Sequence, residues 1–145
     1  MTNPSILSTP LDGIKVLDLT SVLYGPYATQ MLADLGADVI KIETPEGDPT
    51  RHIGPERTPN MAVQVLSTNR NKRRAVLELK KQSDQAAHWR VIARADMFDH
   101  HIRPQRIQKR GISSSNILKR NENHGHCRIH GSHDNSTDAR RPPPH

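Results

Sequence analysis

Two stretches of the sequence carry residue types that bind anions. In the first, residues 20–26, Gly25 can take backbone angles closed to other residues, and Pro26 suits the first position of a helix. A helix that begins there points unpaired N–H groups and a partial positive charge at the turn, which suits a phosphate. The second stretch, residues 69–74, has four cations in five positions. It is either a solvated turn or a phosphate clamp, and the sequence leaves both readings open.

The sequence around the first stretch predicts the elements that position it. Residues 13–19 have the composition of a strand, residues 26–36 carry apolar side chains at helical spacing, and residues 38–43 return as a second strand. A strand, a helix and a strand in so short a chain form a βαβ unit, whose strands are parallel. Ligands of such sheets bind beyond the carboxyl ends of the strands, here at residues 20–26 and in the loop after Glu43.

Further elements extend this pattern along the chain. Residues 75–79 and 95–99 resemble strands, residues 84–94 a helix, and residues 104–109 the start of a polar helix. Residues 52–67 are ambiguous between helix and strand. The alternation predicts an α/β fold, a partial doubly wound (Rossmann-like) parallel sheet.

The composition divides the chain into unequal parts. Residues 1–99 hold 12 Lys/Arg and 12 Asp/Glu, whereas residues 100–145 hold nine Lys/Arg, three Asp/Glu and seven of the nine histidines. Apolar residues are too few beyond Gly111 to bury a layer. We therefore expect a mobile leader at 1–10, an α/β domain at 11–111 and a basic, His-rich, disordered C-terminal tail at 112–145.

Targeting signals are not evident in the sequence. The N-terminus lacks the basic and apolar regions of a signal peptide, and no run approaches the length of a membrane helix. The single cysteine, Cys127, cannot form an internal disulfide, so we expect a cytoplasmic protein with no membrane partner.

Several separate motifs, in order, resemble the family III CoA-transferases. The group includes formyl-CoA and carnitine CoA-transferases and the related α-methylacyl-CoA racemases. The motifs are Pro10-Leu11-Asp12-Gly13-Ile14-Lys15-Val16-Leu17-Asp18-Leu19-Thr20, Gly25-Pro26, Leu32-Ala33-Asp34-Leu35-Gly36-Ala37-Asp38-Val39-Ile40-Lys41-Ile42-Glu43, Asn69-Arg70-Asn71-Lys72-Arg73, Ala95-Asp96-Met97-Phe98 and Ile102-Arg103-Pro104. The likeness is strong to about Gly111.

The resemblance implies the ligand and the reaction. It implies coenzyme A, bound as an acyl-CoA thioester, and transfer of CoA to a carboxylic acid through acyl-aspartyl anhydride and thioester intermediates. By resemblance, the turn residues line the CoA crevice, Thr44 ends the second strand, Lys72 approaches the phosphates, and His101 and Ile102 flank the pantetheine arm. The implied CoA-binding residues are Ser21, Val22, Leu23, Tyr24, Thr44, Lys72, His101, Ile102 and Lys109.

The sequence departs from the family pattern at two important positions. His101 stands where relatives typically have Asn. His145 falls where the family's catalytic aspartate is expected, and an imidazole cannot form the mixed anhydride. The resemblance therefore implies no catalytic residue in this chain, and we expect a truncated member that binds CoA without turning it over. The family's interlocked homodimer is not expected for so short a chain.

Other functions are also compatible with parts of the sequence. A racemase-like member and a non-catalytic structural fragment both stay open. A nicotinamide dehydrogenase would use Glu43 on a ribose, but the turn lacks the G-x-G-x-x-G pattern. The basic tail would attract nucleic acid without specificity, since it has no aromatic residues for stacking. The tail's zinc-type ligands fit no named spacing, so no metal is expected; they are His124, His126, Cys127, His130 and His133.

Overall fold

One sheet of parallel strands organises the chain. The computed structural model describes residues 8–102, 111–112, 114–119 and 125–128. The sheet has five strands in the order β3-β2-β1-β4-β5, and each neighbouring pair is parallel. Along the chain the elements are β1 (Lys15–Leu19), α1 (Tyr24–Asp34), β2 (Asp38–Glu43), η1 (Pro49–His52), α2 (Val63–Asn69), β3 (Lys72–Val76), α3 (Gln82–Ile92), β4 (Met97–His100), α5 (Ser114–Leu118) and β5 (Gly125–Arg128).

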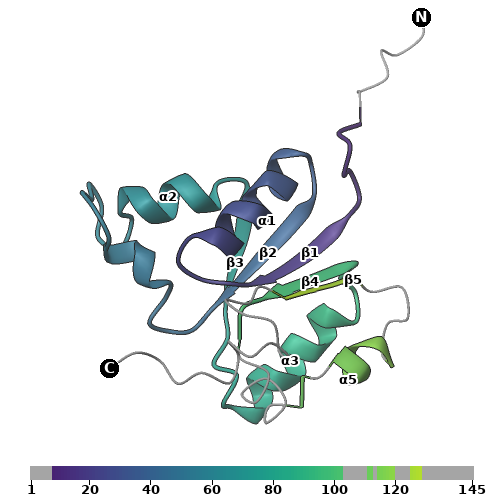
Figure 1. Ribbon diagram of the computed structural model, residues 1–145. Helices are drawn as coiled ribbons and strands as arrows, with labels where there is room; N and C mark the ends of the chain where they lie inside the picture. Colours follow the sequence, from purple (N-terminus) through teal and green to yellow (C-terminus); the bar gives the residue numbers. More distant parts are fainter. Residues whose placement is uncertain (1–7, 103–110, 113, 120–124, 129–145) are drawn as a thin grey trace, which may run out of the picture.

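Helices cover both faces of the sheet. Helices α1 and α2 lie on one face, and α3 and α5 on the other (Figure 1). The two-residue period of β1 divides its side chains between the faces. Val16 packs with Ala33 of α1, whereas Leu17 packs with Ile92 of α3 in the larger core cluster. The buried strand therefore joins two apolar layers, as parallel sheets require.

The strand order reverses direction beside β1. From β1 the chain moves outward through β2 to β3, and it then returns to place β4 on the other side of β1. This confirms the expected α/β fold with a doubly wound parallel sheet. Ligands of such sheets bind at the point of reversal, outside the carboxyl ends of the central strands. Here that point lies between the ends of β1 and β4.

The elements around this point agree with the sequence pattern. The second strand occupies residues 38–43 as expected, and Gly36 ends the preceding helix with a φ of 102°. Helix α2 begins in the ambiguous segment and ends two residues beyond it, and the short helix η1 lies after the loop that follows Glu43. Among the residues that the structure describes, no helix combines the length and the apolar character needed to cross a membrane.

Only Arg70 and Asn71 of the basic run at residues 69–74 form a turn, which corrects the sequence-based expectation of a longer one. Strand β3 begins at Lys72, so Lys72, Arg73 and Arg74 are strand residues paired with β2. Strand β3 lies at the edge of the sheet, and Arg73 and Arg74 are exposed. An edge strand needs less apolar content than a central one, which explains why its sequence resembles a polar turn.

Two elements lie within the segment that we expected to be disordered. Helix α5 and strand β5 fall between residues 112 and 145, and β5 adds a strand to the sheet beside β4. Backbone groups make the ladder, so β5 forms with little apolar content. The expectation was therefore too broad at these residues. The rest of that segment, the leader at 1–7 and the polar helix start at 104–109 lie outside the described residues.

Candidate functional site

A cleft of about 550 Å³ lies at the carboxyl edge of the sheet. Its walls come from the ends of β1, β2 and β4, from the loop that follows β2 and from the segment after β3. Four of the residues implied by the resemblance line it together: Ser21, Thr44, His101 and Ile102. The fold thus brings residues from three separate chain segments to the position where doubly wound sheets bind ligands.

Ser21 and His101 meet across the point where the strand order reverses. Ser21 follows β1, His101 follows β4, and the Ser21 Oγ atom lies 3.2 Å from His101 Nε2. Partial burial, together with the charge of Lys41, lowers the pKa of His101 below its ordinary value of 6.5. The imidazole is therefore neutral at pH 7, and it can either donate a hydrogen bond to a ligand or accept one from it.

The turn between β1 and α1 is strained at one residue. Val22 has a φ of 70°, which is unusual for a β-branched residue. Its N–H donates to both carboxylate oxygens of Asp48, each 3.3 Å away. Gly25 is required close by, because a Cβ there would overlap the side chain of Thr20. These contacts hold the turn in one conformation at the mouth of the cleft.

The exposed residues of this turn do not line the cleft itself. Val22, Leu23 and Tyr24 are 48%, 40% and 80% exposed, and none of them is among the cleft-lining residues. Tyr24 is the first residue of α1, so the N-terminus of this helix lies in the turn, as the sequence predicted. Their contact with a ligand stays a prediction.

A buried ion pair fixes the turn from below. Lys41 Nζ lies 2.9 Å from Asp48 Oδ2, with side chains 2% and 0% exposed, and donates a second hydrogen bond of 2.9 Å to the carbonyl of Thr20. Burial raises the pKa of Asp48, but hydrogen bonds from Thr50 and the charge of Lys41 outweigh it, and the net pKa is lowered. Asp48 is therefore a carboxylate at pH 7 and anchors β2 to the turn.

The ammonium group of Lys72 makes several contacts within the protein. Its Nζ atom is buried beneath α1 and donates to Asp18 Oδ2 at 3.0 Å, to Thr29 Oγ1 at 2.8 Å and to the carbonyl of Pro26 at 2.7 Å. Burial lowers the pKa of Lys72, and Asp18 offsets part of this effect. An ammonium group has three N–H donors, and these contacts engage them within the protein. The expected approach of Lys72 to a ligand phosphate stays a prediction.

Asp18 is the acceptor at the centre of this second buried pair. Burial raises its pKa, but Lys41, Lys72 and the hydroxyls of Thr20 and Thr29 outweigh this effect, so the net pKa is lowered. Asp18 is the penultimate residue of β1, on the face covered by α1, and the hydrogen bond that it accepts from Thr29 attaches that helix to the strand. The pair therefore orients α1 relative to the cleft.

The other cations of the basic run also make intramolecular ion pairs. Arg70 pairs with Asp34 and Arg73 with Asp38, both at 2.6 Å, and Arg74 pairs with Glu43 at 3.0 Å. They border a small hollow of about 340 Å³ between β3 and α2. Sequence alone left a solvated turn and a phosphate clamp open; the structure instead uses the run to attach β3 to its neighbours.

One cleft residue was missed by the sequence reasoning. Lys80 is exposed and lines the cleft after β3, near Glu46 on the opposite loop. Its signal was its place directly after the predicted strand 75–79, at the carboxyl edge. Lys109 and His145 lie outside the described residues. Within the described part of the chain, no three His, Cys, Asp or Glu side chains gather as a metal site would require.

Comparisons with known proteins show what the chain is similar to. The family model described as CoA-transferase family III matches residues 11–143. Acetyl-CoA:oxalate CoA-transferase of Acetobacter aceti is 38% identical over 121 residues, which cover 83% of this chain and 31% of that protein. Human succinyl-CoA:glutarate CoA-transferase is 39% identical over 109 residues, which cover 74% of this chain and 25% of that protein.

Solved structures show the same likeness. A CAIB/BAIF family protein from Brucella suis superposes with a TM-score of 0.87 at 34% identity, over 92% of this chain and 36% of that one. Rv3272 from Mycobacterium tuberculosis gives a TM-score of 0.84 at 35% identity, over 93% and 38% of the two chains. The chain spans about a third of the length of the curated relatives that it matches.

Proposed function

The chain belongs to CoA-transferase family III, and from this premise we propose that its cleft binds the CoA part of an acyl-CoA thioester. The observation that supports the proposal is the meeting of Ser21, Thr44, His101 and Ile102 in one cleft at the carboxyl edge. These residues were chosen from the sequence by resemblance, and they come from segments far apart in the chain. The relatives' names describe enzymes that act on CoA thioesters of carboxylic acids.

The cleft suits the pantetheine arm of CoA better than its phosphates. Ile42, Leu77 and Ile102 supply apolar wall, while Ser21 and His101 supply hydrogen-bonding groups for the amides of the arm. We assign Ser21, Thr44, His101 and Ile102 to this arm. Val22, Leu23 and Tyr24 would contact it at the mouth of the cleft, and Lys109 stays a proposed basic contact.

Lys80 is our candidate for the contact with a CoA phosphate. Its exposed ammonium lines the cleft, whereas that of Lys72 is buried against Asp18. We therefore assign Lys72 a positioning role: it holds α1 and Asp18 in place and leaves the ligand to other groups.

Transfer of CoA requires a carboxylate that can reach the thioester carbonyl. The buried carboxylates beside the cleft, Glu43 and Asp48, are ion-paired with Arg51 and Lys41 at 2.8 and 2.9 Å. A carboxylate engaged in this way is a weak nucleophile. Glu46 and Glu78 also line the cleft, but Glu46 accepts a hydrogen bond from Thr44, and Glu78 accepts one from the N–H of Lys80. Without a positioned nucleophile the proximity advantage of about 7–11 kcal/mol is lost. We propose that these 145 residues bind CoA without transferring it. The lone Cys127 supports the cytoplasm as the proposed location.

Calorimetric titration of the 145-residue chain with CoA tests the binding proposal. We expect saturable binding, weakened on the order of tenfold by Lys80→Ala, since a hydrogen bond to a charged group contributes about 1.5–3 kcal/mol. Lys81→Ala is the matched control, because Lys81 is the next residue, is exposed and does not line the cleft. Equal weakening by both substitutions would remove Lys80 from the site, and absence of any binding would refute the proposal.

The absence of transfer needs its own measurement. Acetyl-CoA and oxalate, named for the Acetobacter relative, provide a first substrate pair. We expect no oxalyl-CoA by chromatography and no acyl-protein adduct after hydroxylamine trapping. Detection of either product in the unmodified chain would show that a nucleophile is present.

A further inference from the structure

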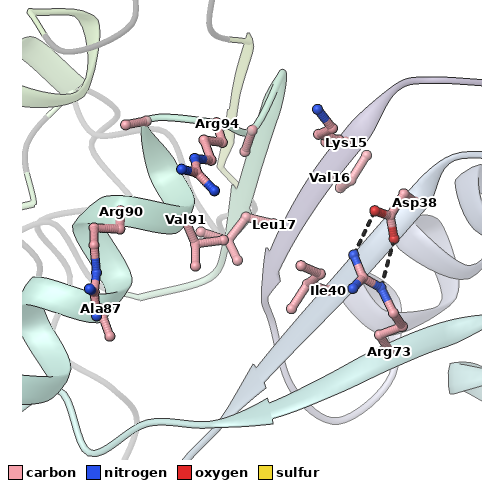
Figure 2. A pocket seen from close by; sticks show the side chains of 12 residues that line it. Lys15, Val16, Leu17, Asp38, Ile40, Arg73, Ala87, Arg90, Val91 and Arg94 are labelled. Atoms are coloured by element: carbon pink, nitrogen blue, oxygen red, sulfur yellow. Dashed lines mark hydrogen bonds and ion pairs between the residues drawn. The ribbon is translucent and has the colours of Figure 1, made fainter.

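A third hollow lies at the opposite, amino edge of the sheet. This groove of about 720 Å³ lies between α3 and strands β1 to β3. Figure 2 shows Leu17, Ile40 and Val91 between the two walls, with Ala87 along the helix. Ile40 and Val91 are only partly buried, although both pack against the main core cluster. The groove therefore has an apolar floor that the described part of the chain does not cover.

Cations stand on both sides of this floor. Arg90 lies on α3, and Arg94 lies in the turn that follows this helix. Lys15 and Arg73 lie on the strands opposite (Figure 2). Arg73 is paired with Asp38 at 2.6 Å. Among the described residues, no acidic side chain forms an ion pair with Lys15, Arg90 or Arg94. The rim is thus positively charged on two walls above an apolar strip.

Parallel sheets bury both of their faces, because their strands are apolar on both. On the face with α3, this arrangement leaves β2 partly open at Ile40. A helix with one apolar stripe and acidic flanks would place the stripe on the apolar floor and its carboxylates beside the cations of both walls. We propose that the groove binds an acidic amphipathic helix from another polypeptide, with its apolar stripe on Ile40 and Val91 and its carboxylates beside Lys15, Arg90 and Arg94.

Charge argues against this chain itself as the occupant. The whole chain has a formal charge of +6, and residues 100–145 contribute nine Lys/Arg against three Asp/Glu. A second copy, or the basic C-terminal segment, would bring cations to a cationic rim. An acidic partner with an apolar stripe would bury the floor and pair its carboxylates with the cations of the rim.

Fluorescence anisotropy on the full 145-residue chain tests this proposal. The probe is a labelled helical peptide with a leucine stripe and glutamate flanks; a scrambled peptide and one with lysine flanks serve as comparisons. The double variant Arg90→Glu/Arg94→Glu reverses one wall of the groove. Its matched control, Arg57→Glu/Lys119→Glu, makes the same change of charge at exposed residues outside the groove. Ala87→Trp fills the groove without changing its charge.

We expect the acidic peptide to bind more tightly than both comparison peptides, with an affinity that falls as salt rises. The groove reversal and Ala87→Trp should each weaken binding at least tenfold, while the control pair leaves it within twofold. Circular dichroism of each variant checks folding, and Ala87→Trp keeps the test valid if the charge reversal disturbs α3. Equal binding of the acidic and scrambled peptides, or unchanged binding in Ala87→Trp, overturns the proposal.

Discussion

Replacing Asp48 by Asn should destabilise the protein far more than the loss of one surface ion pair. The substitution keeps the shape of the side chain but leaves the ammonium of Lys41, 2% exposed, without its counter-ion. Removing one partner of a buried pair costs about 3–5 kcal/mol. The free energy of unfolding of an ordinary domain is about 5–15 kcal/mol, so this loss is a large share of the total stability. The strained turn at Val22 also loses a charged acceptor for its N–H.

Urea unfolding at pH 7, followed by far-UV circular dichroism, measures this loss. Asp38→Asn is the matched control: Asp38 pairs with Arg73 at 2.6 Å, but the side chains are 44% and 65% exposed. We expect the free energy of unfolding of Asp38→Asn to fall by less than about 1 kcal/mol. In the double variant Lys41→Met/Asp48→Asn the stranded charge is gone, so much of the loss should be recovered. If Asp48→Asn cost no more than Asp38→Asn, the buried pair would not hold the turn.

Two further predictions concern strain and pH. Val22→Gly should raise the midpoint of urea unfolding, because a left-handed conformation costs an L-residue about 1–2 kcal/mol and Gly less; a lower midpoint would contradict the strain. Burial lowers the pKa of His88 from 6.5 to about 4, so the unfolded chain binds an extra proton between these values and stability falls as pH drops through them. His88→Leu should remove roughly 2 kcal/mol of the loss between pH 7 and pH 5, and an unchanged pH dependence would contradict this. Asp99, whose pKa burial raises to about 6, titrates in both proteins and cancels in the comparison.

The central βαβ unit was predictable because its signals agree with one another. β-Branched residues, helical spacing and Gly36 mark consecutive segments, and the structure places β1, α1 and β2 there. The position of the cleft follows from that topology. Ser21, Thr44, His101 and Ile102 were named by resemblance, and no spacing rule alone would join residues so distant in sequence.

The misread segments share a physical cause. Strand β3 carries three cations in succession, and only the neighbouring acids on β1 and β2 make that composition compatible with a strand. Strand β5 is held to β4 through backbone pairing, which leaves no apolar pattern to read. Likewise, Lys41 within an apolar strand and Asp48 in a polar loop gave no sign that they would be buried together. In each case the structure depends on contacts between residues distant in sequence, and the local sequence does not reveal these contacts.

The reversal of strand order has a consequence for the sequence of events in folding. The contact between Lys41 and Thr20 closes a separation of 21 residues, whereas that between Ser21 and His101 closes one of 80. The longer loop is about two doublings of the shorter one, which adds roughly 1.2 kcal/mol to the entropic cost of closing it. We therefore expect β1, β2 and β3 to pair before β4 docks on β1. On the ribosome, a nascent chain that has not yet exposed residues 97–100 can complete β1, β2 and β3. It has the strained turn and its buried ion pairs, but the second wall of the cleft has not yet been made.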